Sequence, residues 1–258
     1  VGNTRLQVGD AEGAEAAAQE ALAIDDQMAR AYPIDHRDLK LTWMPHWHDM
    51  GLIGCVFPAL RHPGPLTLIG PEVFVTRPAV WLRAISNYGG TVSPAPNFAY
   101  ELCLTKLHDA DLDGLDLGSL RMAFNGAEPV SPNTMRRFAE RFAAYGLHRQ
   151  ALAAVYGLAE AAVGLAFPPP GRGPLIDVIQ RERFTAQGEA VPVSDAKADV
   201  LEFVACGRPL PGYEVRVVDQ GGRELPERRE GRLEFRGPSA TRGYLRNPEA
   251  SARLRDGD

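Results

Sequence analysis

Between residues 39 and 167, short apolar runs alternate with longer stretches in which apolar side chains recur every three to four positions. Short apolar runs bounded by proline or glycine are typical of buried strands, and longer amphipathic stretches are typical of helices. The short runs predict strands at 41–45, 65–69 and 91–95 and at the starts of 120–130 and 151–167. The longer stretches predict helices at 50–60, 78–90, 97–107 and 131–146.

This alternation predicts the α/β class, with a mainly parallel sheet flanked by helices. In such sheets, ligands bind at the carboxyl ends of the strands. Three polar segments follow predicted strands, at 46–49, 125–128 and 156–160. We therefore expect these segments to meet at one crevice.

The character of the chain changes at Pro168. Residues 168–200 are rich in proline and charge and indicate a surface insertion or linker, whereas 201–258 alternate in short strands typical of an antiparallel, barrel-like module. The predicted organisation is a helical N-terminal segment at 1–38, an α/β subdomain at 39–167, the insertion, and an incomplete β-rich subdomain at 201–258.

Composition narrows the function classes. A net charge of −5 over 258 residues argues against nucleic acid as a partner. No apolar run is long enough to span a membrane, and the first residues lack the pattern of a signal peptide. Three widely spaced cysteines (Cys55, Cys103 and Cys206) are typical of reduced thiols in a cytoplasmic protein.

Two histidines and an aspartate crowd the segment "TWMPHWHDMGL". On a strand, His46 and His48 would share one face, but two imidazoles without a third ligand make a poor zinc site. Taken alone, His48 is more simply a hydrogen-bonded histidine at a strand end. A serine triad is not indicated, because no GxSxG elbow occurs in the sequence. Glu128 and Glu160 could form an acid–base pair, but the sequence does not fix their separation.

Two further segments have features of a nucleotide site. "NGAEP" (125–129) leaves a bare backbone that a planar ligand could approach. "YGLAE" (156–160) combines an aromatic ring that could stack on a purine with a carboxylate suited to Mg²⁺. Each segment alone is a weak signal, since small-residue turns are common.

In this order, "HWHDMGL", "NGAEP", "YGLAE" and "GRLEFRGPSATRGYLRNPEAS" resemble motifs of the adenylate-forming (AMP-binding) superfamily. The resemblance extends over about residues 39–258. "HDMGLIG", "SPAPNFAYELC", "FNGAEP" and "CGRPLPGYEVRVVD" are most similar to fatty-acyl-AMP ligases, which also carry an extra segment where 168–200 lies here. In that family the segment is implied to hinder the domain movement of a coenzyme A half-reaction. A long-chain acyl-coenzyme A synthetase is the alternative.

The resemblance implies that a fatty acid and ATP form an acyl-adenylate, with Mg²⁺ as the metal ion. His48 would border the carboxylate, and Glu160 would bind Mg²⁺. The implied nucleotide-binding residues are Asn125, Gly126, Ala127, Glu128, Tyr156 and Gly157. The implied acyl-pocket residues are Trp47, Met50, Pro96, Asn97 and Phe98. The acceptor would be an acyl carrier protein or coenzyme A.

The sequence departs from the family pattern at both ends. No phosphate loop precedes Leu41, and the chain stops at "RLRDGD", where the family continues into a Thr-Gly-Asp segment and a lid domain with a catalytic lysine. Two hypotheses follow: a ligase fragment that is inactive alone, which we favour, or a non-catalytic module that binds acyl chains or nucleotide. We expect the isolated chain to exchange no pyrophosphate into ATP.

Overall fold

The computed structural model describes residue 28 and residues 34–62, 64–193 and 199–254. The predicted N-terminal helix therefore lies outside the described residues, apart from Met28. Within the described ranges, no helix is both long and apolar enough to cross a membrane.

Five parallel strands form the central sheet, in the order β2-β1-β3-β4-β5. The strands are β1 (Lys40–Thr42), β2 (Leu66–Leu68), β3 (Val92–Ala95), β4 (Met122–Asn125) and β5 (Leu152–Ala154). Strands β1, β3 and β5 are buried along their whole length, because helices cover both faces of the sheet. The predicted α/β class and parallel sheet are confirmed.

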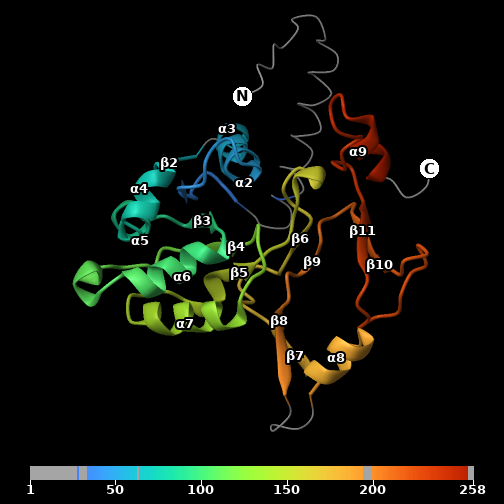
Figure 1. The fold of residues 1–258 in the computed structure, drawn as a ribbon. Coiled ribbons are helices and arrows are strands. Elements are labelled where there is room, and N and C mark those ends of the chain that lie inside the picture. Colours follow the sequence, from blue (N-terminus) through green and yellow to red (C-terminus); the bar gives the residue numbers. More distant parts are fainter. Residues whose placement is uncertain (1–27, 29–33, 63, 194–198, 255–258) are drawn as a thin grey trace, which may run out of the picture.

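Helices cover the sheet as the sequence pattern predicts. They are α2 (Asp49–Gly51), α3 (Phe57–Arg61), α4 (Pro71–Thr76), α5 (Ala79–Tyr88), α6 (Asn97–Lys106) and α7 (Pro132–Ala143). Figure 1 shows α6 and α7 on one side of the sheet and α2 and α3 on the other. Trp81, Tyr100 and Phe138 join α5, α6 and α7 through edge-on ring contacts, with centroids 5.4 and 4.9 Å apart. This aromatic core fixes the sheet that carries the candidate site.

The predicted helix 50–60 is interrupted in its middle. Residues Leu52–Val56 form a π-helical turn between α2 and α3. A π-turn contains one more residue than an α-turn, and such turns are frequent at functional sites. Helix α7 begins as predicted, because the Ser131 hydroxyl accepts a hydrogen bond from the Thr134 N–H (3.2 Å) and Pro132 occupies the first helical position.

The C-terminal part is built from short antiparallel pairs. The strands and helices are β6 (Ala166–Phe167), β7 (Ile176–Gln180), α8 (Arg181–Gln187), β8 (Val200–Val204), β9 (Arg208–Pro209), β10 (Glu214–Val218), β11 (Arg232–Arg236) and α9 (Pro248–Arg253). They pair as β6–β9, β7–β8 and β10–β11. The predicted antiparallel pairing is observed, but among the described residues it gives three separate two-stranded sheets and no closed barrel.

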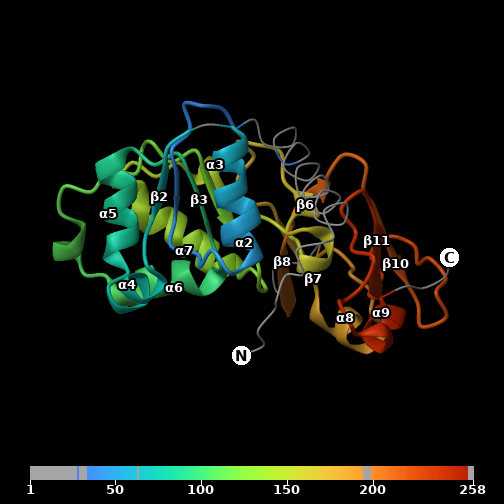
Figure 2. The ribbon, with the colours of Figure 1, turned by 90° about the horizontal axis from the view of Figure 1, so that it is seen from above.

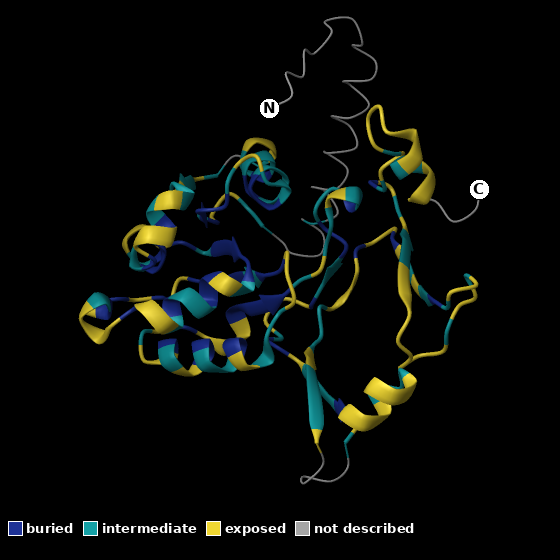
Figure 3. Cartoon of the chain, viewed as in Figure 1, coloured by how far each residue is buried: buried dark blue, intermediate teal, exposed yellow. Residues whose placement is uncertain are grey.

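The segment 168–200 contains regular structure, which its proline-rich composition had hidden. It includes β7 and α8, and β7 pairs with β8 over all five residues of each strand. Figure 2, seen from above, places β7, β8, β10 and β11 to one side of the parallel sheet. Figure 3 shows that burial is deepest in the parallel sheet and weaker in these ribbons. The central sheet is therefore the rigid support of the molecule.

Candidate nucleotide and acyl site

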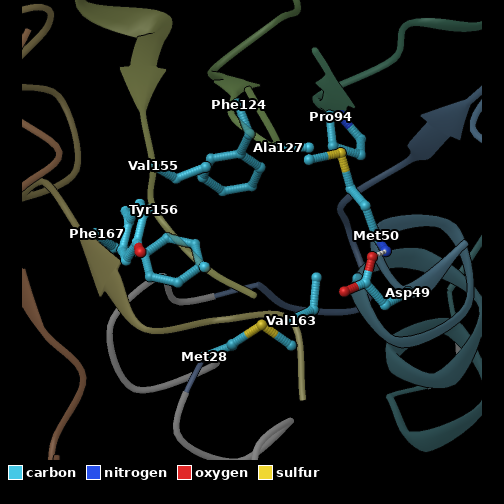
Figure 4. A pocket seen from close by; sticks show the side chains of 12 residues that line it. Met28, Asp49, Met50, Pro94, Phe124, Ala127, Val155, Tyr156, Val163 and Phe167 are labelled. Atoms are coloured by element: carbon cyan, nitrogen blue, oxygen red, sulfur yellow. Dashed lines mark hydrogen bonds between the residues drawn. The ribbon is translucent and has the colours of Figure 1, made fainter. Parts of the chain in front are cut away.

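A cavity of about 80 Å³ lies beyond the carboxyl ends of β3, β4 and β5 (Figure 4). Its lining comes from all three polar segments and from apolar side chains around them. The lining residues are Met28, Asp49, Met50, Gly54, Pro94, Phe124, Ala127, Val155, Tyr156, Gly157, Val163 and Phe167. The predicted convergence of the segments 46–49, 125–128 and 156–160 is therefore observed, through Asp49, Ala127, Tyr156 and Gly157.

Tyr156 and Gly157 stand at the base of a closed loop. The Tyr156 N–H donates to the Ala166 carbonyl (3.0 Å), and the Ala166 N–H donates back to the Tyr156 carbonyl (2.9 Å). A Cβ at Gly157 would lie 1.7 Å from the Val163 carbonyl oxygen, so only glycine fits there. The Tyr156 ring is 40% exposed and faces the cavity, where it could stack on a planar ligand.

The loop carries backbone strain beside the cavity. Ala162 and Val163 have φ angles of 48° and 78°, a region that is unfavourable for a β-branched residue. Ala127, on the facing turn, has a φ of 66°. Non-glycine residues in this region persist only where the surrounding structure imposes them, and they cluster at ligand sites. The cavity rim is therefore held in shape before any ligand binds.

The turn 125–128 approaches the neighbouring strand very closely. The Val155 N–H donates to the Asn125 carbonyl (2.9 Å), and a Cβ at Gly126 would lie 2.8 Å from Val155 Cγ2. Glycine at 126 thus lets the two chain segments meet, and Ala127 follows it into the cavity lining.

The side chains of Asn125 and Glu128 face helix α6 instead of the cavity. The buried Asn125 Nδ2 lies 3.2 Å from Asn97 Oδ1, which also accepts the Ser131 N–H (3.0 Å). Glu128 Oε1 accepts the Phe98 N–H in the first turn of α6 (2.6 Å). None of Pro96, Asn97, Phe98, Asn125, Gly126 and Glu128 lines the cavity. Their contacts hold the turn and the start of α6 together.

His48 caps helix α2 and lies next to the lining residues. Its Nδ1 lies 2.7 Å from Asp49 Oδ1, and the Met50 N–H approaches both atoms, at 3.1 and 2.7 Å respectively. The Met50 N–H is therefore shared between the capping His48 imidazole and the Asp49 carboxylate. Asp49 and Met50 line the cavity, whereas His48 does not. Trp47 is 74% exposed and makes an edge-on ring contact with His46.

Glu160 lies in the 3₁₀ turn Ala159–Ala161, three residues beyond Gly157. The Tyr244 hydroxyl donates to Glu160 Oε1, and the Thr241 N–H donates to the Glu160 carbonyl (2.8 Å). The hydrogen bond to Glu160 raises the pKa of the Tyr244 hydroxyl above its ordinary value. Glu160 does not line the cavity itself.

The described residues contain no group of three or more side chains that could hold a metal ion. A single carboxylate nevertheless fits Mg²⁺, which commonly binds one or two carboxylates and completes its shell with substrate phosphates and water. Glu160 is such a carboxylate, and the cavity beside it is open to a ligand.

Sequence reasoning missed most of the apolar lining. Phe124 and Phe167 meet edge-on with ring centroids 5.8 Å apart, and Pro94 and Val155 complete the same wall. Successive residues of a strand face opposite sides, so Phe124 faces the cavity when Asn125 faces the helices. This alternation was the available signal.

The fold and the cavity define a class of protein: an α/β protein that binds its ligand at the carboxyl ends of parallel strands. A family model for AMP-binding enzymes matches residues 14–245. The chain belongs to the AMP-binding enzyme family.

Curated relatives agree with this assignment. A putative acyl-CoA synthetase of Caulobacter vibrioides is 33% identical over 217 residues, which are 84% of this chain and 38% of the relative. A 4-hydroxyphenylalkanoate adenylyltransferase of Mycobacterium marinum is 36% identical over 84% of this chain and 35% of its own length. A long-chain-fatty-acid–AMP ligase of Mycobacterium tuberculosis is 36% identical over 83% of this chain and 36% of its own length. The chain thus spans well under half the length of these relatives.

Solved structures give the same result. A structure from a study of fatty acyl-adenylate ligases of E. coli and L. pneumophila superposes with a TM-score of 0.88 and 31% identity, over 92% of this chain and 43% of that chain. A fatty acyl-adenylate ligase of L. pneumophila in complex with acyl adenylate and pyrophosphate superposes with a TM-score of 0.85 and 29% identity. The match covers 90% of this chain and 40% of that chain.

Proposed function

We propose that this chain forms part of the catalytic centre of an ATP-dependent fatty acid–AMP ligase. The reaction joins a fatty carboxylate to the α-phosphate of ATP and releases pyrophosphate. The observation that carries the proposal is the single cavity into which the segments 46–49, 125–128 and 156–160 all lead. The similarity to proteins named as fatty acyl-AMP ligases supports it.

Each segment has a distinct role in the proposal. The Tyr156 ring stacks on the adenine, and the backbone of Ala127, which follows Gly126 into the cavity lining, accommodates its edge. A carboxylate oxygen of the fatty acid attacks the α-phosphorus, and the bond to pyrophosphate breaks in line with the attack. His48 lies near the fatty carboxylate. Bound at Glu160, Mg²⁺ would neutralise phosphate charge.

The apolar wall of Phe124, Val155 and Phe167 suits an acyl chain or an aromatic ring. A drug-sized ligand needs about 300–1,000 Å³. A cavity of about 80 Å³ therefore holds one end of the ligand, and the remainder extends along the open rim. The predicted acyl-pocket residues Trp47 and Phe98 would contact that outer part.

The alternative is a long-chain acyl-coenzyme A synthetase. The ligase is favoured because the described part of 168–200 is attached to the rest of the fold. It forms strand β7 and helix α8, and β7 pairs with β8. Strand β8 is in turn joined to helix α7. That tie is the ion pair between Arg136 and Glu202, with N–O distances of 3.2 and 2.6 Å. The pairing of β7 with β8 over five residues, to which the partly exposed ion pair adds little, would hold the insertion against the domain movement of a coenzyme A half-reaction. A barrel-like arrangement of the β-rich part and a cytoplasmic location also belong to this proposal.

The nucleotide site can be tested by calorimetric titration of the chain with ATP in the presence of Mg²⁺. Base–aromatic stacking is worth about 1–3 kcal/mol, so Tyr156→Ala should weaken ATP binding roughly tenfold. Tyr88→Ala is the matched control, since Tyr88 is exposed at the end of α5. Equal affinities for the two variants would remove the stacking role. Absence of ATP binding by the parent chain would refute the nucleotide site.

The acyl acceptor separates ligase from synthetase. Because the isolated chain is expected to be inactive, pre-formed acyl-adenylate is offered to the longer ligase of which this chain is proposed to form part, together with either coenzyme A or a phosphopantetheinylated acyl carrier protein. The proposal expects transfer of the acyl group to the carrier protein only. Mass spectrometry of both acceptors measures this transfer. Formation of acyl-coenzyme A would favour the synthetase, and binding of acyl-adenylate without transfer to either would favour a non-catalytic module.

A further inference from the structure

We propose that Tyr244 is the positioning residue for Glu160: its hydroxyl fixes one carboxylate oxygen and so directs the other toward the Mg²⁺ of Mg·ATP. This inference rests on the proposed function, which makes Glu160 the metal ligand. Tyr244 lies 84 residues from Glu160 in sequence and belongs to a different part of the fold.

A segment of the β-rich part, residues 239–244, lies across the turn that carries Glu160, and we call it the clasp. Three hydrogen bonds attach it: the Tyr244 hydroxyl to Glu160 Oε1, the Thr241 N–H to the Glu160 carbonyl (2.8 Å), and the Ser239 hydroxyl to the Ala161 carbonyl (2.8 Å). The first reaches the side chain, and the other two hold the backbone around it. The clasp therefore controls where the carboxylate points.

Tyr244 is itself held from behind by helix α9. The Ser251 hydroxyl accepts the Tyr244 N–H (2.8 Å), and the Asn247 N–H donates to the Tyr244 carbonyl (3.2 Å). Asn247 also caps α9, through Ala250 N–H (3.1 Å). Gly243 allows this packing, because a Cβ there would lie 2.8 Å from the Ser251 hydroxyl oxygen. These contacts fix the backbone that carries the Tyr244 side chain.

A carboxylate has two oxygens, and the contacts on this one are asymmetric. Oε1 accepts the Tyr244 hydroxyl, whereas no described residue donates a hydrogen bond to Oε2. Groups that hydrogen-bond a metal-ligating side chain orient it, and their removal commonly costs ten- to hundredfold in metal affinity. Tyr244 therefore acts through Glu160 and contacts neither metal nor substrate.

Calorimetric titration of ATP, with saturating Mg²⁺ and separately in EDTA, isolates the metal-dependent part of binding. Tyr244→Phe should weaken Mg·ATP binding roughly tenfold or more while changing ATP binding in EDTA less than about twofold. Tyr88→Phe removes the same atom from an exposed tyrosine and should change neither. Ser251→Ala removes the hydrogen bond that holds the Tyr244 backbone. It should also weaken the Mg²⁺-dependent part of ATP binding, by a smaller factor than Tyr244→Phe.

The double variant with Glu160→Gln separates the two proposals. If Glu160→Gln abolishes the gain from Mg²⁺, adding Tyr244→Phe should change nothing further. If Glu160→Gln binds Mg·ATP like the parent chain, the metal role of Glu160 fails, and that of Tyr244 fails with it. If Glu160→Gln is weakened but both Tyr244→Phe and Ser251→Ala match the parent, only the positioning role is overturned. Thermal melting of each variant shows whether it is folded.

Discussion

Single residues set the shape of the candidate site through sterics more than through charge. Gly126 and Gly157 lie where a side chain would collide with Val155 and Val163. Ala127 and Val163, on opposite sides of the cavity, have backbone angles that most residues avoid. Such close contacts pre-form a rim against which a flat ligand can lie.

We expect Gly157→Ala to lower the free energy of unfolding by about 3 kcal/mol, because overpacking of this kind forces the backbone to move. Urea denaturation provides the measurement. Gly54→Ala is the control: it also lies on the cavity, but its nearest neighbour would be 4.0 Å away. A Gly157→Ala variant as stable as the control would show that the loop adapts freely.

The three cysteines differ in burial, which predicts a difference in reactivity. Burial raises the pKa of the Cys55 thiol to about 12 and also raises those of Cys103 and Cys206, but Cys55 and Cys103 are buried whereas Cys206 is only half-buried. Since the thiolate is the reactive form, a disulfide reagent at pH 8 should label Cys206 first and the other two only after unfolding. Thiol counting before and after denaturant checks this. Rapid labelling in a Cys206→Ser variant would contradict it.

At the scale of elements, the amino-terminal edge of the sheet is tied by one buried carboxylate. Asp38, just before β1, accepts from the Arg121 guanidinium next to β4 and from the Thr91 hydroxyl next to β3 (2.7 Å). The Asp35 N–H adds a further bond (3.0 Å). One side chain thus links three strands, at the edge opposite the candidate site.

Asp38→Asn should lower the free energy of unfolding at pH 7 by about 2 kcal/mol, the usual value of hydrogen bonds to a charged group. Burial alone would raise the pKa of Asp38, but Arg121, Asp35 and Thr91 together hold it below its ordinary value. A depressed carboxyl pKa stabilises the fold above the unfolded pKa near 4 and ceases to do so as the pH falls through the folded value.

The difference in free energy of unfolding between the parent chain and Asp38→Asn should therefore be constant above about pH 5 and shrink below about pH 4. Denaturation curves at several pH values test this. Asp113→Asn is a control, because Asp113 is exposed and lies in a turn. A difference that grew on acidification would show that Asp38 is not held ionised.

The parallel strands and the main helices could be predicted because each carries a complete local signal. For α7 the cap Ser131, the first-turn Pro132 and an apolar stripe all agree with the observed helix. The π-turn at 52–56 could not be predicted, since its composition is that of an ordinary helix. Strand β7 was hidden because its short apolar alternation lies between prolines and charges, and only pairing with β8 makes it regular.

The candidate site was predicted at the level of segments and only in part at the level of side chains. Tyr156, Gly157, Ala127 and Met50 line the cavity, as expected from their motifs. Motif letters do not state which face of a strand a residue occupies, so Phe124 was missed. Long-range contacts such as that from Tyr244 to Glu160 depend on the arrangement of the whole fold.

At the scale of the whole molecule, the β-rich part is attached to the α/β part by the clasp, by the pairing of β6 with β9 and by an ion pair. The Arg136–Glu202 pair joins α7 to β8, and both side chains are partly exposed. A double-mutant cycle with Arg136→Ala and Glu202→Ala should give a coupling energy below about 1 kcal/mol that decreases with added salt. A coupling of several kcal/mol, insensitive to salt, would contradict this estimate.

The π-turn at Leu52–Val56 has a consequence for how this helix tolerates insertions and deletions. Each residue advances an α-helix by about 100°. The wide turn takes up one extra residue, so removal of one residue from 52–56 would restore regular winding while Asp49 and Met50 keep nearly the same orientation relative to Phe57. Removal of one residue from an α-helical turn has no such outlet and would turn Asp49 and Met50 away from the ligand by about that angle. The wide turn is therefore the part of this helix where a change in length disturbs the cavity lining least.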